Sequence, residues 1–113
     1  MIVHIEGRTT EIKEPRPATL KKYGLELDDW KELLAQQGYR CPICKHIPST
    51  GRFVVDHFHA QGYKKMSPEK KRKYIRGILC SYCNHWHVAK GITIERAENV
   101  VTYLKNYEAR RPR

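Results

Sequence analysis

Long hydrophobic runs are missing from this chain of 113 residues. No apolar stretch approaches the roughly 20 residues that a membrane-spanning helix needs, and no signal-peptide pattern opens the sequence. Both absences argue against a membrane partner, and we expect the chain to work in a reducing, cytoplasmic environment. A chain of this length forms one domain with a modest core, so a bound metal would supply a real share of its folding free energy.

Acidic residues are scarce, because 12 Asp and Glu stand against 22 Lys and Arg, which gives a formal charge of +10. Residues 64–76 carry +6 of that excess and residues 105–113 carry +3, whereas residues 1–40 are balanced. A positive field focused in one segment favours a polyanion, most simply nucleic acid, over a small neutral substrate. The alternative is a solvated lysine-rich loop that serves solubility.

Cysteine is confined to two Cys-x-x-Cys pairs, Cys41 with Cys44 and Cys80 with Cys83, and none is left over. This spacing lets two thiolates on one tight turn reach the same tetrahedral ion, so we predict a structural Zn²⁺ held by all four. Disulfide pairing is the alternative reading, which a reducing compartment disfavours. A redox protein that uses the pairs as exchanging thiols is a further possibility.

The spacing of apolar residues predicts an α+β domain. Trp30, Leu33 and Leu34 share one helix face and are expected in the core, and the stripe of Ile94, Ala97, Val101 and Leu104 is expected to pack in the core or a dimer interface. The predicted strands are a hairpin or arm over residues 1–17 and two strands over 52–57 and 74–79. Two helices are predicted before the first cysteine pair, over 19–23 and from a cap at Asp28 or Asp29 to Gly38. Three more are predicted after it: one capped by Ser67, one from Ser81 to about Lys90 with Gly91 as its terminator, and one capped by Thr93.

Polar residues with catalytic potential lie between and beside the cysteine pairs. The motif Asp56-His57-x-His59 places a hard oxygen ligand beside an imidazole that takes a proton near neutral pH, and Asn84 directly follows the last cysteine. Alone, the Asp56-His57 pair would be read as a solvated dipeptide. Its position between two zinc-binding turns instead indicates a metal-dependent nuclease.

These motifs, taken in order, resemble the recombination endonuclease VII family of phage nucleases, which belongs to the HNH group with the ββα-metal fold. The resemblance covers roughly residues 20–91. It rests on Lys22-Tyr23-Gly24-Leu25, Trp30 to Gln37, Cys41-x-x-Cys44, Val55-Asp56-His57-x-His59, Gly62, and Arg76-Gly77-Ile78-Leu79-Cys80-x-x-Cys83-Asn84.

The resemblance implies a small zinc-stapled ββα-metal domain (HNH, or His-Me finger) with flanking helices and with DNA as its substrate. The four cysteines would hold the structural Zn²⁺, Asp56 and Asn84 would hold a catalytic Mg²⁺ or Mn²⁺, and His57 would be the general base. The setting would be a bacterial or phage-infected host cell. The expected organisation is an arm over 1–17, a nuclease domain over 18–107 with core 39–91, and a basic tail over 108–113.

Two departures from the family pattern concern DNA recognition and dimerisation. Family members pass from Gly62 to Arg76 in a few residues, so residues 64–73 are a basic insertion here. The chain ends soon after its last predicted helix, where junction-resolving members continue into a dimerising region, so duplex, nicked and branched DNA and a homodimer all stay open. The expected DNA-binding residues are Lys64, Lys65, Lys70, Lys71, Arg72, Lys73 and Arg76.

The chemistry of phosphodiester hydrolysis fits the same residues. Asp56 and the amide oxygen of Asn84 are oxygen ligands suited to a hard cation, and strand neighbours point to opposite faces, so His57 would be free to accept a proton from water. His59 would steady the phosphate, partly replace the base, or be passive. His87, three residues after Asn84, would complete the ion site and shift its preference toward Mn²⁺, Co²⁺ or Ni²⁺.

A zinc-ribbon protein that binds DNA without cutting it is the competing hypothesis. It explains the cysteines and the charge, but it gives no reason for Asp56, His57, His59 or Asn84. Cleavage of DNA with Mg²⁺ or Mn²⁺ distinguishes the two.

Overall fold

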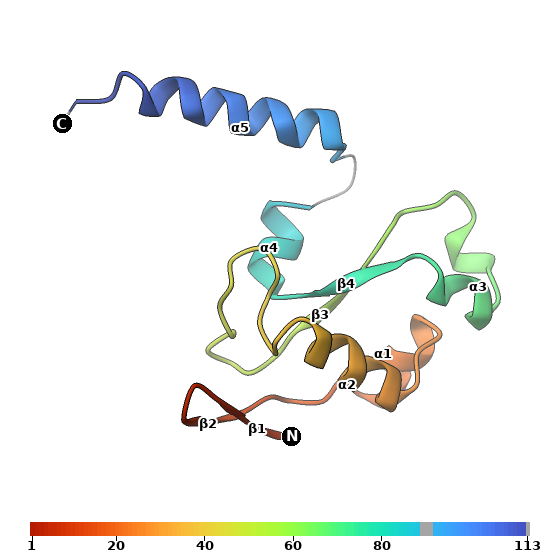
Figure 1. The fold of residues 1–113 in the computed structure, drawn as a ribbon. Helices are drawn as coiled ribbons and strands as arrows, with labels where there is room; N and C mark the ends of the chain where they lie inside the picture. Colours follow the sequence, from red (N-terminus) through yellow and green to blue (C-terminus); the bar gives the residue numbers. More distant parts are fainter. Residues whose placement is uncertain (89–91, 113) are drawn as a thin grey trace.

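The computed structural model describes residues 1–88 and 92–112. In these residues two small antiparallel sheets, β1 with β2 and β3 with β4, combine with short helices, which confirms a small α+β fold. Figure 1 shows the elements in chain order. They are β1 (Ile2–Ile5), β2 (Arg8–Glu11), α1 (Pro17–Lys22), α2 (Leu27–Gln36), β3 (Val54–His57), the 3-10 helix η1 (Tyr63–Lys65), α3 (Pro68–Arg72), β4 (Ile75–Leu79), α4 (Ser81–Trp86) and α5 (Ile94–Glu108).

The N-terminal segment forms the predicted hairpin and packs onto the domain. Its turn is made by Glu6 and Gly7, both at positive φ. Val3 and Ile12 are buried in the core, and the terminal amine donates a 2.9 Å hydrogen bond to the carbonyl oxygen of Ile12. The first residues are therefore anchored in the domain.

The start of α1 and the cap of α2 differ from the prediction. Helix α1 begins at Pro17, which suits a first helical turn because its nitrogen has no hydrogen to leave unpaired. Glu26 is the N-cap residue of α2, and Asp29 at the third helical position accepts a 2.9 Å hydrogen bond from the Glu26 N–H. The predicted caps at Asp28 and Asp29 were wrong, because Asp29 bonds back to the N-cap from inside the first turn.

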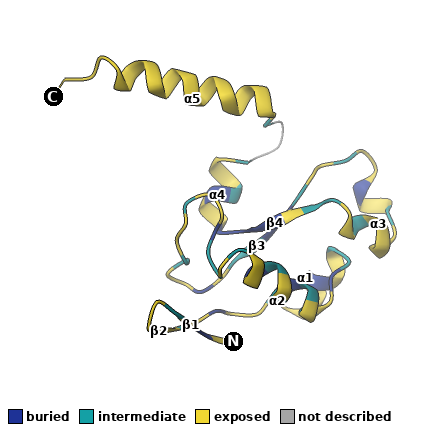
Figure 2. Ribbon diagram, in the orientation of Figure 1, coloured by how far each residue is buried: buried dark blue, intermediate teal, exposed yellow. Residues whose placement is uncertain are grey.

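The largest core cluster joins the hairpin, α1, α2 and the second sheet. Trp30, Leu34, Ile12 and Ile78 are almost fully buried in it, which confirms Trp30 and Leu34 as core residues. Figure 2 shows the buried residues along β4. Helix α2 thus supports one face of the sheet that carries Asp56 and His57.

Gln37, just past the end of α2, ties this helix to β4 by side-chain hydrogen bonds. Its amide oxygen accepts from the Ile78 N–H at 2.9 Å, and its amide nitrogen donates to the Ile78 carbonyl oxygen at 2.8 Å. A side chain on Gly77 would approach this amide oxygen to 3.1 Å. Gln37 therefore satisfies the edge of β4 in the way that a further strand would.

Helix α5 is capped as predicted, since the Thr93 hydroxyl accepts a 3.1 Å hydrogen bond from the Arg96 N–H. The core alternative for its apolar stripe is wrong, because every α5 residue is exposed, including Ile94, Val101 and Leu104. The dimer-interface alternative stays a prediction. Figure 1 shows α5 extending away from the rest of the chain. An amphipathic stripe predicts that a face favours burial, but it does not specify which surface buries it. No helix in the described residues is long and apolar enough to cross a membrane.

Replacing Gln37 with Leu should lower the free energy of unfolding by about 1–3 kcal/mol, because the Ile78 N–H and carbonyl would lose their partners. Urea unfolding of the zinc-loaded protein measures this. The control is Gln36→Leu at the exposed neighbouring position, which should change stability little. Equal stability of the two variants would contradict the role given to Gln37.

Candidate functional site

The sulfurs of Cys41, Cys44, Cys80 and Cys83 converge as the sequence predicts. All four lie within 4.8 Å of one another, and in residues 1–88 and 92–112 they form the only such group of three or more His, Cys, Asp or Glu ligand atoms. A tetrahedral zinc with Zn–S bonds of about 2.3 Å has S–S edges of roughly 3.8 Å. The 3.9 Å between the Cys44 and Cys80 sulfurs fits this geometry, so the cluster can hold a structural metal ion such as zinc.

The protonation of these thiols is uneven. Burial favours the neutral thiol of Cys41, but surrounding backbone N–H groups outweigh it and lower the pKa of Cys41 to about 7. Burial and the neighbouring thiols raise the pKa of Cys83 above its usual range. An ion that binds all four sulfurs must therefore release protons, which makes metal affinity depend on pH.

The second cysteine pair also begins α4. Cys80 is the N-cap residue, and its sulfur accepts a 3.4 Å hydrogen bond from the Cys83 N–H, so the predicted cap at Ser81 was wrong. The helix ends at Trp86 rather than near Lys90, and the predicted terminator Gly91 lies outside the described residues. This helix lies against β3.

A β-bulge determines the surroundings of Asp56. Asp56 pairs with Gly77, but His57 pairs with Ile75, so Arg76 has no partner opposite it. Arg76 instead donates two side-chain hydrogen bonds to the Asp56 carboxylate, from Nε to Oδ2 at 2.8 Å and from Nη2 to Oδ1 at 2.9 Å. Asp56 is 5% exposed, and a buried carboxylate of this kind needs such a partner.

His57 lies in an aromatic pocket that its position in the sequence does not indicate. Its ring stacks on Tyr63 with centroids 4.3 Å apart and planes at 20°. Tyr23 is 5.5 Å away, and the His59 ring is 4.6 Å away. Tyr63 comes from η1, at the edge of the basic insertion, so sequence reasoning missed it as a positioning residue. The available signal was an aromatic residue, Tyr63, directly before Lys64 and Lys65.

The protonation of His57 follows from these neighbours. Burial, then the adjacent His59, lowers the pKa of His57 below its usual value, and Arg76 and Lys22 act in the same direction. The Asp56 carboxylate opposes them. The result is an imidazole that is mostly neutral at pH 7 and able to accept a proton.

The remaining predicted site residues are Asn84 and His87, at α4, and His59, beside His57. Asn84 is half-buried within α4, while His87 is exposed at the C-cap, with its ring 5.6 Å from the Tyr82 ring. His59 is exposed beside His57. In the described residues, His87 does not join Asp56 in a cluster of potential ligands.

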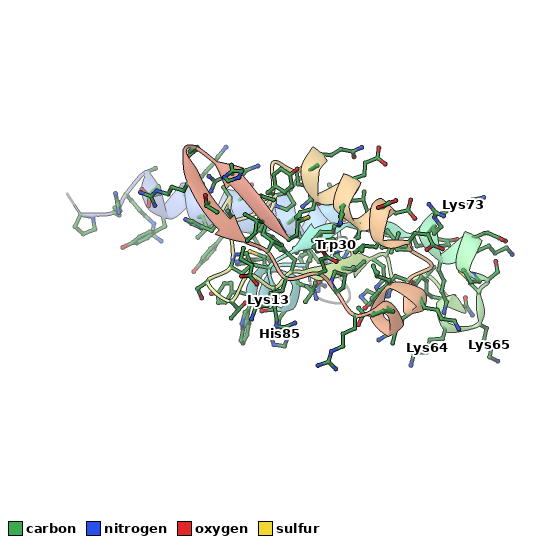
Figure 3. The ribbon with its side chains drawn as sticks, turned by 90° about the horizontal axis from the view of Figure 1, so that it is seen from below. Lys13, Trp30, Lys64, Lys65, Lys73 and His85 are labelled. Carbon is green, nitrogen blue, oxygen red and sulfur yellow. The ribbon has the colours of Figure 1, made fainter. Side chains whose placement is uncertain are left out.

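The basic insertion, residues 64–73, contains α3 and all but the first residue of η1. Helix α3 begins as predicted, with Ser67 as its cap and Pro68 as its first residue. Two of its cations already have partners, since Arg72 pairs with Asp29 at 3.0 Å and the Lys71 amine lies 5.5 Å from the Tyr63 ring centroid. Lys64, Lys65, Lys70 and Lys73 are exposed. Figure 3 shows Lys64, Lys65 and Lys73 at one end of the molecule, well apart from His85.

Comparison of the sequence with known proteins identifies a family. Residues 17–106 match the model of the recombination endonuclease VII family. The chain belongs to this family. The Gene 59 protein of Mycobacterium phage L5 is 30% identical over 89 residues, which are 77% of this chain and 48% of that protein. The Gene 59 protein of Mycobacterium phage D29 is 28% identical over 103 residues, 84% of this chain and 56% of that protein.

The chain thus spans about half the length of the curated relatives that it matches. No solved structure matches it. The four cysteines and the Asp56-His57 pair all lie inside the matched residues.

Replacing Cys83 with Ser should release the metal ion and unfold the domain, because a closed four-thiolate site contributes folding free energy directly. Zinc content by plasma emission spectrometry and circular dichroism measure the two effects. Ser81→Ala is the control, since Ser81 is exposed and does not cap α4. A folded Cys83 variant without zinc would contradict the structural role.

Proposed function

We propose that this protein is an HNH-type DNA endonuclease with a ββα-metal site formed by β3, β4 and α4. It would hydrolyse phosphodiester bonds in duplex, nicked or branched DNA with one divalent ion and a histidine base. One observation carries the proposal. A buried carboxylate, Asp56, and a partly buried imidazole of lowered pKa, His57, are strand neighbours that face different surroundings.

Asp56 and the amide of Asn84 are the proposed ligands of the catalytic Mg²⁺ or Mn²⁺. Both offer the oxygen atoms that hard cations prefer, and they come from a strand and a helix that lie against each other. When bound, such an ion would neutralise charge that develops on the leaving oxygen. His87 remains a proposed third ligand, although it is exposed and belongs to no ligand cluster in the described residues.

His57 is the proposed general base. Its lowered pKa keeps the ring neutral and ready to take a proton from the attacking water. Stacking on Tyr63 would limit the ring's motion and so hold the accepting nitrogen in place. His59, exposed beside it, is proposed to contact the scissile phosphate.

The exposed lysines of the insertion are the proposed contacts to the DNA backbone. Lys64, Lys65, Lys70 and Lys73 offer charge near the end of the hairpin where His57 lies, because the insertion connects β3 to β4. Lys71, Arg72 and Arg76 were predicted to bind DNA as well. Each of these three contacts a ring or a carboxylate within the chain, so reaching DNA would require that contact to open.

A homodimer and a place in the cytoplasm of a phage-infected cell also remain proposals. The exposed apolar side chains of α5, among them Ile94 and Leu104, support self-association because water contact with them is unfavourable. The relatives come from phages, which supports the host setting. The nuclease domain is proposed to cover residues 18–107.

The function is tested by replacing His57 with Ala. Cleavage should fall at least about 100-fold, the loss typical of a missing general base, while zinc content, DNA binding and Mn²⁺ binding persist. Nicking of supercoiled plasmid and cleavage of linear, nicked and four-way-junction DNA, each with Mg²⁺ or Mn²⁺, provide the measurements.

His46→Ala is the matched control, since His46 is exposed and the contacts that it makes with the first cysteine turn come from its backbone. It should cut like the parent. A parent protein that binds DNA and never cuts it would favour the non-catalytic zinc-ribbon alternative.

Replacing Lys70 and Lys73 together with Gln should flatten the slope of log affinity against log salt by about 1–2, because each phosphate contact contributes roughly 0.9. Fluorescence anisotropy with duplex DNA measures this slope. The control replaces Lys13 and Lys45, which are exposed and lie outside the insertion, and should leave the slope unchanged. Equal salt slopes for the two double variants would show that Lys70 and Lys73 of the insertion do not contact the DNA backbone.

A further inference from the structure

The Arg76 guanidinium has three acceptors around it. Two are the oxygens of Asp56 at 2.8 and 2.9 Å, and the third is the Val88 carbonyl oxygen, 3.3 Å from Nη2. Val88 follows the C-terminal end of α4, the helix that carries Asn84. One side chain therefore links β3, β4 and the end of α4 at the centre of the candidate site.

The bulge explains why Arg76 reaches Asp56. In a regular ladder Arg76 would pair with His57, and its side chain would point to the sheet face opposite to that of Asp56. Because His57 pairs with Ile75 instead, Arg76 is the extra residue of β4, and bulges characteristically redirect a side chain. Because the bulge lies directly opposite Asp56 and His57, it directs the positively charged side chain of Arg76 onto Asp56, the candidate metal ligand.

The bidentate pair occupies the atoms that a metal ion would need. A hard divalent cation binds carboxylate through these same oxygens at about 2.0–2.6 Å. Asp56 has two, and each already accepts a guanidinium N–H. A cation that binds on the side of the carboxylate facing Arg76, or across both oxygens, must therefore displace at least one of these hydrogen bonds. A cation that binds elsewhere on Asp56 is repelled by the positive charge of the guanidinium beside it.

The two partners differ in their freedom to move. The Asp56 side chain is 7% exposed, whereas the Arg76 side chain is 34% exposed and sits at the end of a long stem. Arg76 can thus swing toward solvent while Asp56 stays in place. A guanidinium released beside a DNA strand is suited to bind phosphate through two parallel hydrogen bonds.

We propose that Arg76 is a displaceable counter-ion of Asp56, which the divalent cation replaces and so releases to bind a phosphate of the substrate. The inference rests on the proposed role of Asp56 as a metal ligand. It adds that Arg76 and the divalent cation compete for the Asp56 carboxylate. One of these two positive charges therefore neutralises the buried carboxylate whether or not the ion is bound. Reciprocal coupling between two ligands of one group is a thermodynamic necessity, and typical coupling amounts to 5–150-fold in affinity.

The test is Mn²⁺ binding to zinc-loaded protein without DNA, measured by the electron paramagnetic resonance signal of free Mn²⁺. Arg76→Gln should bind Mn²⁺ at least about fivefold more tightly than the parent. Arg72→Gln is the matched control, because it also removes one positive charge and one Arg–Asp pair, four residues away. It should change the affinity by less than the Arg76 substitution does.

Asp56→Asn separates this inference from the proposed function. In that background Mn²⁺ affinity should drop, and adding Arg76→Gln should bring no gain. If neither the parent nor Arg76→Gln binds Mn²⁺, or if Asp56→Asn binds it like the parent, both the metal site and the inference are overturned. Mn²⁺ binding that depends on Asp56, with an affinity of Arg76→Gln equal to that of the parent or of Arg72→Gln, would overturn only the competition. Unchanged zinc content and circular dichroism show that each variant is folded.

Discussion

The convergence of four sulfurs brings together the chain segments on either side of the site. Cys41 and Cys44 follow α2, whereas Cys80 and Cys83 lie where β4 passes into α4, so a single cluster joins the segment after α2 to the β4–α4 junction. A domain of this size buries a limited core, and a metal ion at the cluster would add the cross-link that the core lacks. Asp56 and Asn84 depend on this cross-link for their positions, because β3 and α4 meet beside it.

The basic insertion has two physical roles in this structure. Its exposed lysines supply a concentrated positive charge, while Tyr63, the residue directly before it, is buried against His57. Lys71 and Arg72 face back onto the domain and fix the segment to Tyr63 and α2. Charge density and the support of the imidazole are therefore coupled, so a change in the loop that disturbs Tyr63 would reach His57 as well.

Electrostatics in the sheet centre on one buried carboxylate. The cost of desolvating Asp56 is offset by two hydrogen bonds from Arg76, and the same arginine helps to lower the pKa of His57. Movement of Arg76 would consequently alter the charge felt by both residues. The bulge opposite Asp56 is the structural origin of this coupling, because it turns Arg76 toward the carboxylate.

The sequence by itself determined the α+β class, the cysteine cluster, the core role of Trp30 and the family, because ligand spacing and local periodicity are carried by neighbouring residues. Cap positions at Glu26 and Cys80 were missed, since a capping hydrogen bond depends on the local path of the backbone. Only the tertiary structure decided that Tyr63 stacks on His57, that Arg76 occupies Asp56 and that α5 is exposed. Each of these depends on contacts, or their absence, between segments distant in sequence, and a one-residue bulge is invisible in a pattern of alternating side chains.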